Sequence, residues 1–329
     1  MTTLAGLGDI ASDFIIPLEH YGVIALEGDD KETYLQGQVT VDVPGITDTQ
    51  ARRSAHCDFK GKTWSLHTIA RHNQRILMSL PGDVLDISLA QLNKYGVFSK
   101  VDIVDASETY HQFALCGEQA ERWITRQFGA LPDGDLAAVS SDAGVVIKLD
   151  APVGVFLVIA ANTLISEIQE FAQSDGVDQY DARVFEALSV AAGIPHITAA
   201  HSNEYVPQML NWQALGGIDF RKGCYMGQEV VARTKYLGKN KRGAFIFRLG
   251  AGVPLPADAM VEKKIGENWR RGGAVIRSAI LGEETWLLAV LNNDTENEDI
   301  FRLASAHEYE FSIQPLPYIV EQEKSNVRK

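Results

Sequence analysis

The clearest chemical potential in this sequence lies in one segment, Arg221-Lys222-Gly223-Cys224-Tyr225-Met226-Gly227-Gln228-Glu229. Good helix formers follow Gly227, so a helix is predicted to begin just after the cysteine. A thiol near a helix N-terminus and two cations has its thiolate form favoured. The pattern therefore predicts a reactive thiol at Cys224, with Lys222 and Arg221 favouring the thiolate. The alternative is a structural cysteine in a tight turn, because free cysteines are commonly buried.

Two further segments could bind a polar ligand. Gln36 and Gln38 flank Gly37, and a glycine lets the backbone approach a ligand closely. Glu204 follows an asparagine in a loop, where a carboxylate could bind a heterocycle with donors and acceptors, such as a pterin. The alternatives are a helix end at Gly37 and simple loop capping by Glu204.

The elements that must position these residues alternate between strand pairs and single helices. Strands are predicted at 51–57, 63–69, 74–80, 100–105, 112–116, 145–149 and 155–160. Helices are predicted from Asp83 to about 97, over 118–128 with Gly129 as the terminating residue, from Asn162 to about 173, and from Asp181 to 192. This order predicts an α+β fold of antiparallel sheets with helices on one face.

The pattern changes twice in the second half of the chain. Residues 196–223 have little periodicity, and we expect an ordered loop there. Strands are predicted at 243–249, 273–281, 285–291 and 309–314, with no helical period between them. We therefore predict an α+β region at 1–242 and an all-β domain at 243–329, with a polar tail from Pro317.

Composition limits the class of protein. The chain has 329 residues, 46% hydrophobic and 22% charged, with a formal net charge of −13. Such a charge disfavours direct binding of nucleic acids, although a local basic patch could override it. No signal sequence and no apolar stretch of about 20 residues is present, so we expect a cytoplasmic protein without a membrane span. Three scattered cysteines and no CxxC pair predict neither disulfides nor a metal site.

Five ordered motifs together resemble the YgfZ family. Lys222–Glu229 resembles the K-G-C-Y-x-G-Q-E signature of that family. The other matching segments are Gln36–Thr40, His56–Asp58 with Lys60–Lys62, Gln213–Ile218 and Gly266–Arg271. They occur in family order over nearly the whole chain.

The resemblance implies an aminomethyltransferase-like fold, with three domains around a central cavity that holds folate. Residues 1–242 would then be the folate-binding region, built from two interleaved α+β domains, and residues 243–329 a C-terminal β-barrel. It implies tetrahydrofolate as the cofactor and iron–sulfur enzymes as clients, including enzymes that modify tRNA. Cys224 would be the functional centre, with Lys222 beside it. Tyr21 and Phe185 fall where some relatives have tryptophans that contact folate. Gln36, Gln38 and Glu204 are the candidates for polar folate contacts.

One departure separates this chain from the aminomethyltransferases that it resembles. Those enzymes carry an aspartate pair on the strand after the hairpin turn, whereas Gly61–Leu66 here contains no carboxylate. A charge partner for the folate amine is therefore missing. We expect an accessory protein without aminomethyltransferase activity. The alternatives are a folate-dependent one-carbon transferase and an interaction module with a structural cysteine.

Overall fold

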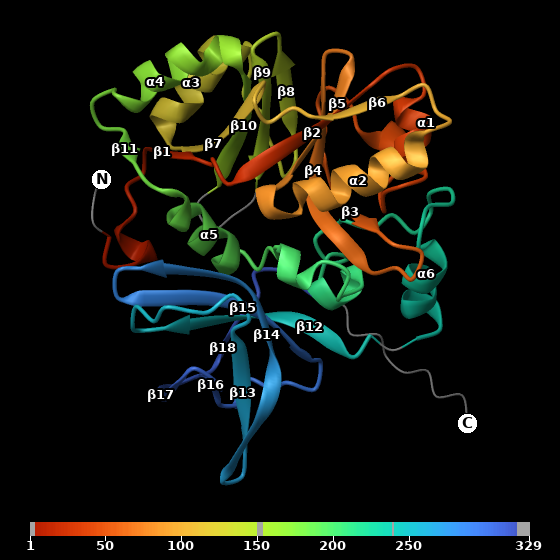
Figure 1. The fold of residues 1–329 in the computed structure, drawn as a ribbon. Helices are drawn as coiled ribbons and strands as arrows, with labels where there is room; N and C mark the ends of the chain where they lie inside the picture. The colour runs from red at the N-terminus through yellow and green to blue at the C-terminus, as the bar shows by residue number, and fades with distance from the viewer. Residues whose placement is uncertain (1–3, 150–153, 239, 321–329) are drawn as a thin grey trace.

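The computed structural model describes residues 4–149, 154–238 and 240–320, and its strands form three sheets (Figure 1). The first sheet has the order β3-β4-β5-β2-β6. Its strands are β2 (Tyr21–Glu27), β3 (Arg52–Cys57), β4 (Thr63–His72), β5 (Arg75–Pro81) and β6 (Asp102–Asp105). Its pairs are all antiparallel.

The second sheet has the order β11-β1-β7-β10-β9-β8, and only the short β1–β11 pair is parallel. Its strands are β1 (Phe14–Pro17), β7 (Tyr110–Cys116), β8 (Ala138–Ser141), β9 (Gly144–Leu149), β10 (Val155–Ala161) and β11 (Asp178–Gln179). The third sheet, β17-β16-β13-β14-β15-β12-β18, is curled, with register shifts in three of its pairs. Its strands are β12 (Arg242–Leu249), β13 (Met260–Ile265), β14 (Asn268–Leu281), β15 (Glu284–Asn292), β16 (Phe301–Leu303), β17 (Ala306–Phe311) and β18 (Ile313–Gln314).

Helices lie against the sheets and between them. They are α1 (Lys31–Gln36), α2 (Leu85–Gly96), α3 (Glu118–Phe128), α4 (Ile165–Ala172), α5 (Ala182–Ala191) and α6 (Gln228–Tyr236). Short 3-10 turns are η1 (Leu7–Asp9), η2 (Val43–Gly45), η3 (Gly82–Val84), η4 (Asn162–Leu164), η5 (Ala199–His201) and η6 (Pro207–Leu210). The α+β class predicted from the sequence is confirmed.

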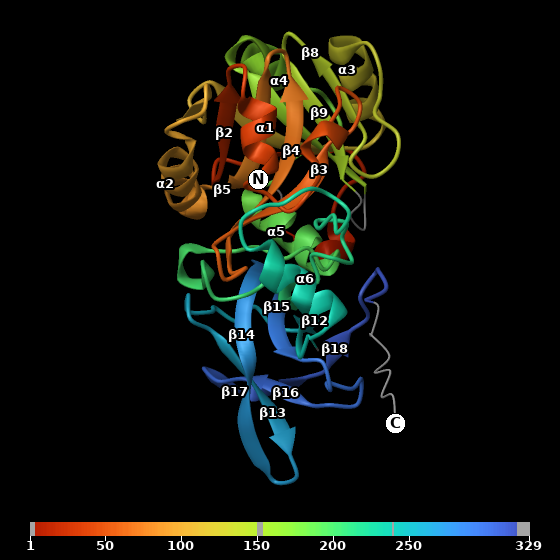
Figure 2. The same ribbon diagram turned by 90° about the vertical axis from the view of Figure 1, so that its right-hand side faces the viewer.

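The side chains of β2 alternate between two hydrophobic cores, one on each face of the first sheet. Val23 and Ala25 belong to the core shared with the second sheet, whereas Ile24 and Leu26 belong to the core under α1 and α2. Successive side chains of a strand point to opposite faces, so a strand of apolar residues serves two cores at once. In both views, α5 lies between these layers and the third sheet (Figures 1 and 2).

Several predicted ends are confirmed and others are wrong. Gly129 closes α3 in the left-handed conformation, and the Asp181 carboxylate accepts a hydrogen bond from the backbone N–H of Arg183 at the start of α5. Asp83 does not cap a helix: it lies in η3, and its carboxylate accepts from the N–H of Ala199 at 3.0 Å. Asn162 likewise starts a 3-10 turn rather than capping α4. Both corrections have one cause, because a 3-10 turn precedes each helix.

The predicted polar tail from Pro317 is partly wrong. The hydroxyl of Tyr318 donates to the carbonyl of Gly193 at 2.7 Å and accepts from the amide of Asn211 at 3.3 Å. Tyr318 therefore holds the segment that follows the last strand, β18, against the residues that follow α5. Residues 321–329 lie outside the described part of the chain.

Candidate functional site

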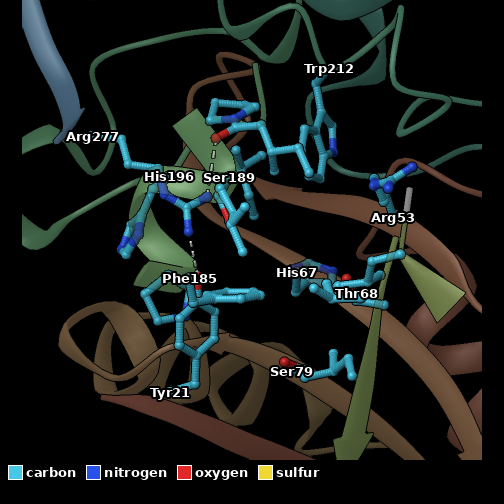
Figure 3. A pocket seen from close by; sticks show the side chains of 18 residues that line it. Tyr21, Arg53, His67, Thr68, Ser79, Phe185, Ser189, His196, Trp212 and Arg277 are labelled. Atoms are coloured by element: carbon cyan, nitrogen blue, oxygen red, sulfur yellow. Dashed lines mark hydrogen bonds between the residues drawn. The ribbon is translucent and has the colours of Figure 1, made fainter. Parts of the chain in front are cut away.

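A largely apolar cavity lies where the three sheets meet (Figure 3). Its empty volume is about 730 Å³, part of it open to solvent. The first sheet contributes Tyr21, Arg53, Leu66, His67, Thr68, Ser79 and Pro81, and the second contributes Leu149, Val155 and Leu157. The remaining lining residues are Phe185, Leu188, Ser189, Ile194, Pro195, His196, Trp212 and Arg277. Residues from all parts of the fold therefore build one cavity.

Tyr21 and Phe185, singled out by the sequence, lie together in its wall. Tyr21 begins β2 and Phe185 lies on α5, yet their ring centroids are 5.7 Å apart with an interplanar angle of 84°. This edge-to-face pair gives the cavity an aromatic wall made by two separate elements.

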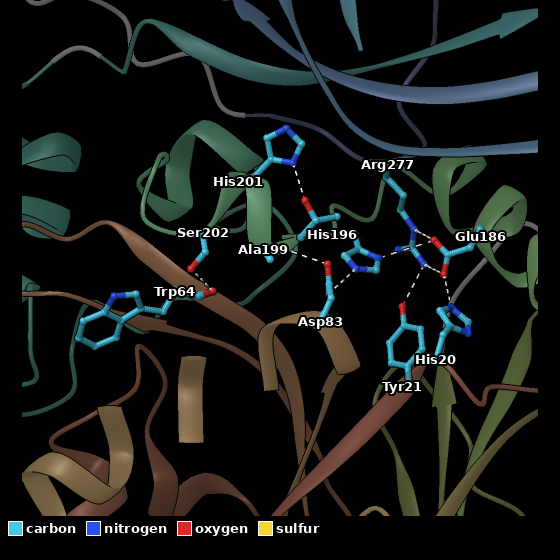
Figure 4. Close-up of polar contacts among 11 residues, drawn as sticks. His20, Tyr21, Trp64, Asp83, Glu186, His196, Ala199, His201, Ser202 and Arg277 are labelled. Atoms are coloured by element: carbon cyan, nitrogen blue, oxygen red, sulfur yellow. Dashed lines mark hydrogen bonds and ion pairs between the residues drawn. The ribbon is translucent and has the colours of Figure 1, made fainter. Parts of the chain in front are cut away.

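A buried ion pair holds the tyrosine in place (Figure 4). The guanidinium of Arg277 donates to both carboxylate oxygens of Glu186, at 2.7 and 3.1 Å, and to the hydroxyl of Tyr21 at 3.1 Å. It also donates to the carbonyl of Ile194 at 3.1 Å. Burial alone would raise the pKa of Glu186, but the Arg277 charge, the nearby His196 ring and the hydrogen bond with His20 hold it well below its usual range. Glu186 is therefore ionised and Arg277 is fully engaged.

His196 extends this network to a second carboxylate. Its ring nitrogens lie 3.6 Å from Glu186 and 3.9 Å from Asp83, while His20 bonds Glu186 at 2.9 Å. Burial would lower the pKa of His196, but the neighbouring Asp83 and Glu186 carboxylates outweigh burial and raise it. Sequence reasoning missed this network. One signal was available, because Arg277 interrupts the apolar run 274–281 of a predicted strand.

The signature segment lies elsewhere, at the start of α6. The ammonium of Lys222 is buried and donates to the carbonyl oxygens of Gln36 and Val39, both at 2.6 Å. Burial lowers the pKa of Lys222 to about 8, although Asp42 and Asp219 act in the opposite direction. Lys222 therefore ties the segment after α1 to the signature segment. An effect of Lys222 on the Cys224 thiol stays a prediction.

Three sequence motifs meet at this point. Gly227 has φ +80°, and a Cβ there would come within 2.4 Å of the Asp58 carbonyl oxygen and 2.8 Å of the Gly61 Cα. The N–H of Met226 donates to the carbonyl of Gly37 at 3.0 Å. Only glycine satisfies both the left-handed conformation and the close approach. The signature segment therefore packs against both the 36–40 and the 56–62 motifs.

Cys224 is the cysteine available to solvent. The other two thiols are buried, and burial raises the pKa of Cys57 to about 12 and also that of Cys116. Within the described ranges, no three His, Cys, Asp or Glu side chains are grouped so that they could hold a metal ion. Cys224 is not among the residues that line the cavity with Tyr21 and Phe185.

The other sequence candidates do not line the cavity. The amide of Gln36 donates to Asp42 at 2.8 Å and accepts from the N–H of Val43 at 2.7 Å, so it stabilises the turn after α1. Gln38 has a buried side-chain oxygen without a hydrogen-bond partner in the described structure. Glu204 is exposed, and its carbonyl accepts from Lys62. A folate contact by these three residues stays a prediction.

Comparison with known proteins decides the family. The chain is 37% identical over 316 residues to the tRNA-modifying protein YgfZ of Colwellia psychrerythraea (strain 34H / ATCC BAA-681), covering 96% of each chain. It is 38% identical over 312 residues to that of Klebsiella pneumoniae (strain 342), covering 93% of each. The chain belongs to the YgfZ family.

The YgfZ family assignment agrees with the domain and fold comparisons. Residues 240–306 match the model described as YgfZ, beta-barrel domain, which confirms the predicted C-terminal barrel. Glycine cleavage system aminomethyltransferase T from Bartonella henselae superposes with a TM-score of 0.71 at 14% identity, over 95% of this chain and 87% of that one. The aminomethyltransferase-like fold is therefore confirmed. No helix in the described ranges has the length and apolar character of a membrane span.

Proposed function

We propose that this YgfZ-family protein binds tetrahydrofolate in the cavity and supports cytoplasmic iron–sulfur enzymes, including those that modify tRNA. The observation that carries the proposal is the pairing of Tyr21 and Phe185, 5.7 Å apart, in one wall. Aromatic side chains pack favourably on flat rings, and folate has two of them, a pterin and a benzoyl group. The apolar side chains of Leu66, Leu157 and Leu188 would cover the remaining ring surface.

The polar groups of the cavity also fit a folate. Thr68 and Ser189, which carry hydroxyl groups, line the cavity. Small binding sites combine mostly apolar walls with a few polar groups that fix orientation. These hydroxyls are available to the donors and acceptors at a pterin edge. Tetrahydrofolate, when bound, would supply a carrier for one-carbon groups.

Folate binding is tested by calorimetric titration with tetrahydrofolate. We expect saturable binding by the parent protein and loss of measurable binding in the Tyr21→Ala, Phe185→Ala double variant, because both ring contacts disappear. The matched control is Phe98→Ala, Tyr309→Ala, which removes two exposed aromatic rings outside the cavity. Equal affinity in the two double variants, both folded by thermal unfolding, would refute the cavity as the folate site.

The accessory role is tested at the exposed thiol. Cys224→Ser should keep the fold and tetrahydrofolate affinity, yet lose the ability to restore iron–sulfur enzyme activity in cells that lack the protein. Cys116→Ser removes a buried thiol and serves as the matched control. Full restoration by Cys224→Ser would refute a thiol role. Turnover of a methylamine donor with tetrahydrofolate would instead favour a one-carbon transferase.

A further inference from the structure

A second hollow lies beside the signature segment, between β3, α6 and the loop 216–221. We refer to it as the α6 cleft, and its empty volume is about 820 Å³. Arg52 lines the α6 cleft, whereas its neighbour Arg53 lines the folate cavity and pairs with Asp135. Since adjacent side chains of a strand point to opposite faces, the two hollows lie on opposite faces of β3.

Three cations converge on the α6 cleft without acidic partners. Arg52, Arg221 and Lys235 line it, and none forms an ion pair within the described part of the chain. Neighbouring Arg53, by contrast, is paired. A group of unpaired cations in a protein of net charge −13 is a local reversal of the overall field.

The two carboxylates of the cleft do not cancel this charge. Asp42 accepts a hydrogen bond from Gln36, and Asp219 accepts one from the backbone N–H of Arg221, both at 2.8 Å. Both also act electrostatically on the buried ammonium of Lys222. Three cations and two carboxylates line the cleft, so an anion there meets an excess of positive charge.

The cleft also has an aromatic side. Phe220 and Tyr236 lie edge to face, with centroids 6.0 Å apart, and the ammonium of Lys235 lies 4.0 Å from the Phe220 ring centre. Tyr236 is 64% exposed, so its ring is free to receive a stacking partner. Arginine forks bind phosphate bidentately, and bases stack on exposed aromatic rings.

We propose that the α6 cleft is a nucleotide-binding site. Arg52, Arg221 and Lys235 would bind the phosphate, and the base would stack on Tyr236. The ligand is either a free nucleotide or a nucleotide within a single RNA strand, since both present the same phosphate and base. An acidic peptide would satisfy the cations but leave the aromatic side unused.

The test is fluorescence anisotropy with a labelled single-stranded RNA decamer, and competition by adenosine monophosphate, inorganic phosphate and a glutamate octapeptide. Arg52→Gln, Lys235→Gln should weaken RNA or nucleotide binding at least tenfold and reduce its salt dependence. Lys94→Gln, Arg122→Gln removes the same charge from exposed positions on α2 and α3 and should change affinity less than twofold. Tyr236→Ala should weaken the binding of RNA and of adenosine monophosphate, but it should leave the binding of inorganic phosphate unchanged.

Each outcome decides the proposal. If RNA binding is lost in the cleft variants but not in the control, the cleft is a nucleotide site whose ligand is part of an RNA strand. If the protein binds the mononucleotide but not the RNA, the ligand is a free nucleotide. Equal losses in the cleft and control variants, no binding of either probe at millimolar concentration, or octapeptide binding that is unaffected by Tyr236→Ala would overturn it. Tetrahydrofolate titration of the same variants separates this result from the folate proposal.

Discussion

Replacement of Arg277 by methionine will lower the free energy of unfolding by about 3 to 5 kcal/mol. The substitution keeps a side chain of similar length but removes the charge that faces Glu186. The side chain of that carboxylate is only 15% exposed, and without Arg277 its negative charge would lose its main partner. The hydroxyl of Tyr21 would lose its donor as well. Urea unfolding at pH 7 measures the change.

Two variants define the cause of this loss. Arg122→Met breaks an ion pair whose side chains are 69% and 84% exposed, and should change stability by less than about 1 kcal/mol. Arg277→Met, Glu186→Leu removes both buried charges and should recover part of the loss. A loss below about 1 kcal/mol in Arg277→Met would contradict our account of the ion pair. Tetrahydrofolate affinity should fall in both Arg277 variants, because Tyr21 is no longer held.

Acidification from pH 7.5 to 5.5 will destabilise the protein through two buried histidines. In the β3–β4 register His56 lies opposite Ser65 and His67 opposite Ser54, so both rings point to one face, under the Ser88 of α2. One ring nitrogen of His56 and both of His67 lack hydrogen-bond partners in the described structure.

Burial lowers the pKa of both histidines to about 3. The unfolded chain therefore binds protons first, near pH 6.5, and stability falls from there until the folded rings titrate near pH 3. Each ring costs roughly 1.4 kcal/mol between pH 7.5 and 5.5. His196 acts in the opposite sense, because its raised pKa contributes stability below about pH 6.5 that is lost as the pH rises through its folded value.

A difference measurement isolates the effect of His67. Urea unfolding at both pH values should show that His67→Leu loses roughly 1.4 kcal/mol less stability than the parent over this range. His307→Leu, an exposed position on β17, is the matched control and should keep the parent slope. An unchanged slope in His67→Leu would contradict a buried, neutral His67.

Local features of the sequence predicted local structure well. The Asp181 cap, the Gly129 terminus and the start of α6 after Gly227 depend on residues within a few positions of each other, and all are confirmed. The prediction of Asp83 as a helix cap was wrong because a distant residue decides its contacts. Its carboxylate bonds the N–H of Ala199, 116 residues away, and no local pattern reveals that competitor.

The site residues also fall into those that the sequence predicted and those that depend on contacts between distant residues. The aromatic pair came from a family resemblance, which already carries information about distant residues. The Glu186–Arg277 pair spans 91 positions, and the Arg277–Tyr21 bond spans 256. Strands β1 and β2 were missed because short apolar runs do not distinguish strands from buried helical turns. Their pairing partners, far along the chain, decide the structure.

The adjacent arginines of β3 impose a constraint on how this chain can change. Arg52 lines the α6 cleft and Arg53 lines the cavity between the sheets, because they occupy alternate positions of an edge strand. Deleting or inserting one residue between this pair and the irregularity at His56 and Cys57 would slip the strand by one position and exchange the faces of its side chains. The unpaired Arg52 would then lie on the face of Arg53, and Arg53 would lie on the face of Arg52, away from Asp135. Length variation is therefore tolerable in the turns on either side of β3, but not within it.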